Sequence, residues 1–248
     1  MKKIIFITIA VLIAGYIIAT VFFFPVANND AQVCGEVEVV VKDSLEKKFL
    51  KEKDVVAFLK NAKQYPLNKK RGEINMQDME NALLKNDIIA TAEVVQTNSG
   101  KIKIVISQKM PILRVFTSAG SYYIDNTGNT MPSALGQAIY VPVASGNIEK
   151  SFAVSDLYEF ALFLQKNTFW NDQIEQIYVR GKNDIEIIPR VGSHRILLGS
   201  LENFEDKLER LNLFYEQVVP KMGWGKYSVI NLKYRNQIVC TKSKNTES

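Results

Sequence analysis

The chain has 248 residues, of which 47% are apolar and 23% are charged. This composition is typical of a globular protein and excludes an intrinsically disordered chain, which combines low hydrophobicity with high charge. The net charge of +5 is spread along the sequence without a dense basic block or a nucleic-acid-binding motif. It indicates a solvated surface that could help the chain approach anionic lipid headgroups. The length predicts one membrane segment and two modest folded units, with one large domain as the alternative.

The N-terminus predicts a membrane anchor. Ile4 to Phe24 form an uncharged run of about the twenty residues that a helix needs to cross a bilayer. A cleavable signal peptide is the alternative, but its apolar region is usually shorter, and Pro25 to Asn28 make a poor cleavage site. Because Lys2 and Lys3 precede the run, the positive-inside rule places residues 1–3 in the cytoplasm. The predicted helix comprises residues 4–24. Everything after it is then outside the cytoplasm.

Residues 33–109 predict a small α+β domain. Gly35 to Val41 is valine-rich and strand-like, and two short helices are expected to begin at the capping residues Asp54 and Asn75. Their expected apolar faces are Val55, Phe58 and Leu59, and Met76, Met79 and Leu83. Two strands, 88–96 and 101–107, follow on either side of the turn Asn98-Ser99-Gly100 and predict a hairpin, with Ile102, Ile104 and Ile106 on one face. The predicted order is therefore β-α-α-β-β.

Residues 110–241 predict a larger β-rich domain with flanking helices. Turn residues and alternating apolar residues mark the strands, and apolar residues at the helical period mark the helices. The expected strands are 112–116, 122–124, 174–180, 185–191, 228–234 and 238–241, and the expected helices are 155–166 and 201–219. The polar tail, residues 242–248, is expected to be disordered.

The two cysteines, Cys34 and Cys240, lie near the ends of the predicted outer portion. Without CxxC spacing or a histidine cluster they do not predict a metal site. A disulfide between them is permitted in an oxidising compartment, but nothing local brings the two residues together. Each would also pack well as a small apolar residue.

Catalytic chemistry has no clear signal in the sequence. The single histidine, His194, lies at a predicted turn without an evident partner, and no nucleotide-binding, hydrolase or zinc-protease motif is present. Roles in turns or helix caps explain four aspartates better than catalysis does: Asp125, Asp156, Asp172 and Asp184. Two converging carboxylates would suit a carbohydrate hydrolase. Trp170 and Trp224 fit core packing better than sugar platforms or interface anchors. We therefore expect a protein that is not an enzyme and binds no cofactor or metal.

Two segments resemble the FtsQ/DivIB family of bacterial cell-division proteins. The first runs from Ile88 to Pro132 and contains I-K-I-V-I-S-Q-K-M-P-I-L-R followed by Y-Y-I-D-N-T-G-N-T. The second, V-I-N-L-K-Y from Val229 to Tyr234, is similar to the family pattern V-D-L-R-Y. Asn231 replaces the usual aspartate and Lys233 the usual arginine, and the cytoplasmic start is unusually short. The order of anchor, β-α-α-β-β module and β-rich domain also matches the family.

The resemblance implies a divisome scaffold. Its polypeptide-transport-associated (POTRA) module would serve recruitment, and its β domain would bind the division proteins FtsB and FtsL at the inner membrane of the septum. The family pattern places Lys233, Tyr234 and Asn236 at the partner-binding strand and its turn, and Arg180 near another basic contact. The ordinary alternative for each is a solvated surface side chain.

Two other functions compete with the scaffold. The first is an anchored POTRA protein that captures translocating polypeptides by strand addition. The second is an anchored cell-wall enzyme, which would require a deep cleft with converging carboxylates.

Overall fold

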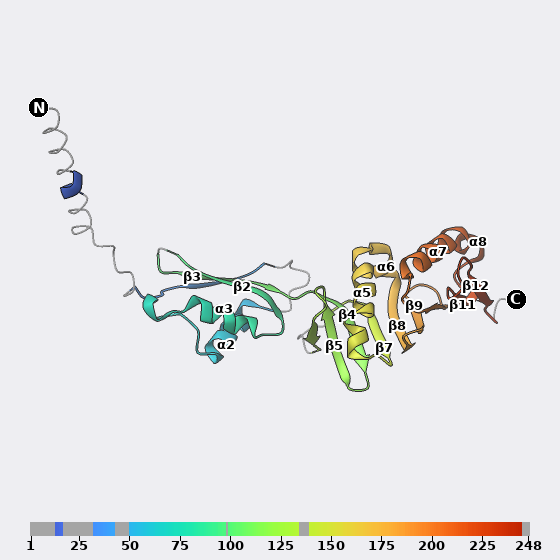
Figure 1. The fold of residues 1–248 in the computed structure, drawn as a ribbon, viewed down its shortest axis with the longest axis horizontal. Helices are drawn as coiled ribbons and strands as arrows, with labels where there is room; N and C mark the ends of the chain where they lie inside the picture. Colours follow the sequence, from blue (N-terminus) through green and yellow to red (C-terminus); the bar gives the residue numbers. More distant parts are fainter. Residues whose placement is uncertain (1–12, 17–31, 43–49, 98, 134–138, 245–248) are drawn as a thin grey trace, which may run out of the picture. The chain divides into compact units, whose positions relative to one another are not determined.

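The computed structural model describes residues 13–16, 32–42, 50–97, 99–133 and 139–244, which form a mixed α and β fold (Figure 1). The chain divides into two compact units. Unit 1 contains the first helices and most of the first three strands, and unit 2 contains the ends of two of these strands and everything that follows. The α+β fold class expected from the sequence is therefore observed.

Unit 1 has the predicted β-α-α-β-β order. Its elements are β1 (Val37–Val41), α2 (Glu52–Asn61), the short 3-10 helix η3 (Arg71–Glu73), α3 (Met76–Leu84), β2 (Ile89–Gln96) and β3 (Ile102–Gln108). The sheet order is β1-β3-β2, with β1 parallel to β3. The two helices lie along one side of this sheet (Figure 1). As a result, β2 and β1 form the two edges of the sheet.

The core of unit 1 follows the predicted apolar faces. Ile102, Ile104 and Ile106 are fully buried, as are the paired helix residues Leu59 and Leu83. Every second side chain along a strand points to the same face, which explains why these three isoleucines of β3 all enter the core.

The two predicted helix caps had different outcomes. The side chain of Asn75 accepts a hydrogen bond from the backbone N–H of Asp78, which confirms it as the cap of α3. Asp54 is not the cap of α2, because the helix begins earlier, at Glu52. Its carboxylate instead accepts a hydrogen bond from the backbone N–H of Lys51. The placement of Met76 on the buried face of α3 was also wrong, because its side chain is exposed.

Unit 2 is built on a nine-stranded sheet in the order β12-β11-β10-β9-β8-β7-β4-β5-β6. Its strands are β4 (Pro111–Thr117), β5 (Gly120–Asp125), β6 (Thr130–Pro132), β7 (Val143–Gly146), β8 (Ile174–Gly181), β9 (Asp184–Pro189), β10 (Arg195–Gly199), β11 (Tyr227–Asn231) and β12 (Val239–Lys242). β7 is parallel to both of its neighbours, and β10 is parallel to β11. The other pairs are antiparallel.

The helices of unit 2 connect strands of this sheet and bury one of its faces. They are α4 (Lys150–Ala153), α5 (Asp156–Lys166), α6 (Thr168–Gln173), α7 (Phe204–Gln217) and α8 (Val219–Met222). Phe160 of α5 and Leu211 of α7 are fully buried together with Ile177, Ile187 and Ile196 of the central strands. The helices between β7 and β8, and between β10 and β11, provide the crossovers that parallel strands require.

Several predicted boundaries in unit 2 were wrong. β6, β7, β10 and the helices α4, α6 and α8 were not predicted. The strand predicted to reach Tyr234 ends at Asn231, and the last strand continues to Lys242, the residue at which a disordered tail was expected to begin. Ser243 is also held, since its N–H donates to the Lys226 carbonyl at 3.0 Å. Residues 245–248 lie outside the described residues.

The predicted membrane segment, residues 4–24, lies outside the described residues except for the helical residues 13–16. Among the helices that the structure describes, none combines the length and the hydropathy needed to span a bilayer. Cys34, which is buried, and Cys240, which is half-buried, are both free thiols. The disulfide that the sequence left open is therefore not formed in this structure.

Candidate protein-binding site

The C-terminal strand β12 forms one edge of the nine-stranded sheet. One side of β12 pairs with β11, from Tyr227 opposite Lys242 to Asn231 opposite Val239. No strand in the described part of the chain pairs with its other side. An edge strand presents a row of N–H and C=O groups that an extended partner segment can use. β12 therefore has the geometry of a docking strand.

The direction of the backbone identifies the groups that β12 presents outward. The N–H of Ser243 points toward β11, because it donates to the carbonyl of Lys226. Backbone groups alternate sides along an antiparallel strand, so the N–H groups of Lys242 and Cys240 point away from β11. These two groups are the donors that a partner strand would meet. The side chains of Thr241 and Lys242 are exposed, whereas burial raises the pKa of the Cys240 thiol.

The loop between β11 and β12, residues 232–238, is held to α7 by one arginine. Nη1 of Arg210 donates to the carbonyl oxygens of Tyr234 at 3.0 Å and Gln237 at 3.1 Å, and Nη2 donates to the carbonyl of Leu232 at 3.5 Å. A planar guanidinium can serve several acceptors at once without rearranging. Arg210 therefore fixes the path of the chain into the docking strand. Sequence reasoning did not identify this residue.

Lys233, Tyr234 and Asn236 all lie in this loop, after the end of β11. Nζ of Lys233 lies 2.7 Å from Oδ1 of Asp184, and this hydrogen bond is the main reason why the pKa of Asp184 lies below its usual value. Tyr234 exposes half of its side chain. Asn236 adopts a left-handed backbone conformation with φ 61°, which asparagine tolerates better than most residues. The structure thus brings these three predicted residues together.

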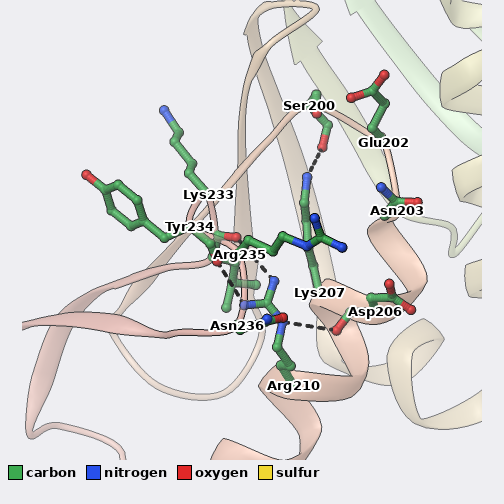
Figure 2. A pocket seen from close by; sticks show the side chains of 11 residues that line it. Ser200, Glu202, Asn203, Asp206, Lys207, Arg210, Lys233, Tyr234, Arg235 and Asn236 are labelled. Carbon is green, nitrogen blue, oxygen red and sulfur yellow. Dashed lines mark hydrogen bonds between the residues drawn. The ribbon is translucent and has the colours of Figure 1, made fainter.

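A hollow of about 510 Å³ separates this loop from the start of α7 (Figure 2). Its charged lining residues are the cations Lys207, Arg210, Lys233 and Arg235 and the acids Glu202 and Asp206. Lys207 donates to the Ser200 carbonyl at 2.8 Å, and burial lowers the pKa of its amine. The ring of Tyr234 points away from the other labelled side chains (Figure 2). With four cations against two acids, the hollow suits a negatively charged group.

Arg180 lies on β8, outside this hollow. Its guanidinium pairs with the buried Glu186 of β9 at 2.8 Å, and Arg195 of β10 pairs with the same carboxylate at 3.2 Å. Both arginine side chains remain half-exposed. Arg180 also contributes, after Lys233, to the low pKa of Asp184. Arg180 is thus connected to the loop electrostatically but sits on a different element.

His194 belongs to a buried aromatic cluster. Its Nε2 lies 2.8 Å from the hydroxyl of Tyr215, and its ring stacks on Trp224 with a centroid separation of 6.0 Å. Burial lowers the pKa of His194 and raises that of Tyr215. Trp170, which also contacts Tyr215, is buried. Both tryptophans thus pack into the domain, as the core-packing interpretation expected.

Two of the aspartates considered as catalytic candidates, Asp125 and Asp184, have structural contacts. Oδ1 of Asp125 accepts hydrogen bonds from the backbone N–H groups of Thr127 and Asn129, which closes the turn after β5. Asp184 is engaged by Lys233. No cluster of three or more metal-ligating side chains occurs among the residues for which the structure gives positions.

The described part of the chain combines a small β-α-α-β-β unit with a large β-rich unit whose C-terminal strand lies at a sheet edge. Comparison with protein families finds a match for each unit. Residues 32–107 match the POTRA-like domain, and residues 110–241 match the family described as FtsQ/DivIB, C-terminal related. The chain belongs to the FtsQ/DivIB family of cell-division proteins. No curated protein matches the chain.

Proposed function

We propose that this chain is a non-enzymatic divisome scaffold that binds FtsB-like and FtsL-like division proteins outside the cytoplasm. A single helix, residues 4–24, anchors it in the inner membrane with residues 1–3 in the cytoplasm. At the septum it links assembly of the division machinery to cell-wall synthesis. The proposal rests on the family match and on the open edge of β12.

Binding proceeds by addition of an extended partner segment to β12. The outward N–H groups of Cys240 and Lys242 supply the main-chain donors, and Tyr234 supplies an exposed aromatic ring beside them. An acidic residue of the partner enters the hollow beside Lys233 and Arg235. Arg180 adds positive charge on β8, which β9, β10 and β11 separate from β12 in the same sheet. Main-chain pairing provides affinity, and these side chains provide selectivity.

The first test is titration of the purified protein with peptides from FtsB-like proteins of the same cell. Lys242→Pro removes an outward N–H without removing the inward bond of Ser243, so we expect it to abolish saturable binding. Lys242→Ala is the matched control, because it removes the same side chain and keeps the N–H. Tyr234→Ala is expected to weaken binding. Equal affinities for the proline and alanine variants would exclude strand addition at β12.

The alternative, capture of translocating polypeptides by the POTRA-like unit, would use an edge of its three-stranded sheet, and β2 is one of the two edges. One donor of that strand is already occupied, because Oε1 of Glu80 accepts a hydrogen bond from the N–H of Val94 at 2.8 Å. A side chain that covers an edge donor hinders strand addition. If Glu80→Ala increased peptide binding and Lys242→Pro left it unchanged, the capture function would replace the scaffold function.

A further inference from the structure

A short basic stretch in unit 1 runs from the last turn of α2 to the first residue of η3. Residues 60–71 contain five cations and no acid: Lys60, Lys63, Lys69, Lys70 and Arg71. We call these five residues the basic loop. From the sequence we expected positive charge spread evenly along the chain and did not identify this local excess of cations. Lys60, Lys63 and Lys70 are exposed, and Lys69 and Arg71 are half-buried.

The basic loop makes backbone and ring contacts with its described neighbours. Nζ of Lys69 donates to the backbone carbonyl of Lys63 at 3.0 Å, so this amine is held by a backbone oxygen and not by a carboxylate. The amine of Lys60 lies 5.1 Å from the centre of the Tyr65 ring. Among the ion pairs of the described residues, none involves a member of the basic loop. Cations grouped in this way attract a multivalent anionic surface.

The basic loop is fastened to the point where the chain enters unit 1. The N–H of Arg71 donates to the carbonyl of Gln32 at 2.8 Å, and the N–H of Cys34 donates to the carbonyl of Lys69 at 2.9 Å. Asn68 returns a bond to the carbonyl of Cys34 at 2.9 Å. The loop therefore cannot move away from residues 32–34 while these bonds persist.

This attachment limits the distance between the basic loop and the predicted anchor. The anchor ends at residue 24, and a chain of eight residues spans at most about 29 Å even when fully extended. A tether of this length gives the loop a high effective concentration at the membrane surface, so weak individual contacts suffice for docking. Leu67 and Val33, both partly exposed, add apolar surface beside the cations.

We infer that the basic loop docks on the anionic phospholipid headgroups of the membrane that holds the chain. The inference rests on the anchor included in the proposed function. Each Lys or Arg close to an anionic bilayer strengthens association by about fivefold, and the attraction falls off within roughly 10 Å. Docking would thereby hold the POTRA-like unit against the membrane without involving β12.

The test uses the full chain reconstituted in nanodiscs of phosphatidylcholine, with or without phosphatidylglycerol. Amide hydrogen exchange of residues 60–71 reports docking. We expect slower exchange in the anionic discs only, and loss of this protection at high salt. The triple variant Lys60→Gln, Lys63→Gln and Lys70→Gln should lower the ratio of docked to undocked chains by about a hundredfold. The control removes equal charge from unit 2 through Lys150→Gln, Lys166→Gln and Lys221→Gln, and should retain protection.

The outcomes separate the inference from the function on which it rests. A chain that inserts in the discs but exchanges equally in neutral and anionic lipid refutes docking and leaves the anchor intact. Loss of protection in the control variant also refutes it, because the effect would then reflect total charge. Failure to insert would refute the anchor and the inference together, whereas peptide binding at β12 would be unaffected.

Discussion

A single side chain, Arg210, organises the loop that leads into β12. Its guanidinium bonds to the carbonyls of Tyr234 and Gln237, which lie 24 and 27 residues away in sequence. Nothing in the local pattern of α7 distinguishes Arg210 from a solvated helix arginine, so its role emerges only when the fold brings the two segments together. The same holds for the pair of Lys233 and Asp184, whose separation in sequence is 49 residues.

Replacing Arg210 with alanine should free the loop and weaken partner binding. Hydrogen bonds to a charged group contribute about 1.5–3 kcal/mol, so we expect the free energy of unfolding to fall by an amount in this range. Urea denaturation measures the loss. Arg235→Ala removes the same charge from the loop itself and should change stability by less than about 0.5 kcal/mol. Equal losses in both variants would contradict the role of Arg210.

His194 makes the stability of unit 2 dependent on pH. Burial lowers its pKa from 6.5 in the folded state, so unfolding is accompanied by proton uptake when the pH falls through that value. The stability from neutral His194 is therefore complete above about pH 6.5 and declines below it. It is the only histidine in the chain. We expect the free energy of unfolding, measured by denaturation, to change less between about pH 5.5 and about pH 7.5 in His194→Gln than in the unchanged protein.

Whole elements were predictable where local pattern and tertiary environment agreed. In β3, the fully buried isoleucines occupy every second position, although Val105 between two of them is also buried, and both strand and face were correct. β7 was missed because the strand has only four residues, Val143 to Gly146, most of them small. It is a strand because it pairs with β4 and β8, which lie far from it in sequence. Of the candidate site residues, Lys233 and Tyr234 were expected in a strand that reaches Tyr234, but β11 ends at Asn231 and both residues lie in the loop with Asn236.

The turn between β11 and β12 sets the position of the docking strand. Asn236 has a positive φ, a conformation that glycine accepts freely and β-branched residues resist. Asn236→Val should therefore cost about 1–2 kcal/mol of stability and reduce partner binding, whereas Asn236→Gly should preserve both. Denaturation and peptide titration of the two variants provide the comparison. A harmful glycine variant would show that the side chain, and not the backbone, is essential.

At the scale of the whole molecule, the two units have separate cores. Leu59 is buried in unit 1 and Phe160 in unit 2. Because close packing is a property of each core, a cavity in one should act mainly on its own unit. We therefore expect the two units to respond separately to changes in their cores.

Core truncations test this separation. Leu59→Ala should destabilise unit 1 by about 2–5 kcal/mol, and Phe160→Ala should destabilise unit 2 by about 3–5 kcal/mol. Amide hydrogen exchange resolves the units, with faster exchange expected in β1 and β3 for the first variant and in β8 and β9 for the second. Peptide binding at β12 should survive Leu59→Ala. Faster exchange in both units from either change would indicate one cooperative structure.

The central position of β7 also bears on how unit 2 folds. The hairpins β4–β5 and β8–β9 form from neighbouring segments, but β7 joins them through two parallel pairings that require distant residues to meet. Contacts between distant residues form slowly, because the intervening chain must first be closed into a loop. We expect insertion of β7 to limit the folding rate. Before β7 inserts, a newly made chain would carry two half-sheets with exposed inner edges. We expect the chain to be most prone to aggregation at this stage.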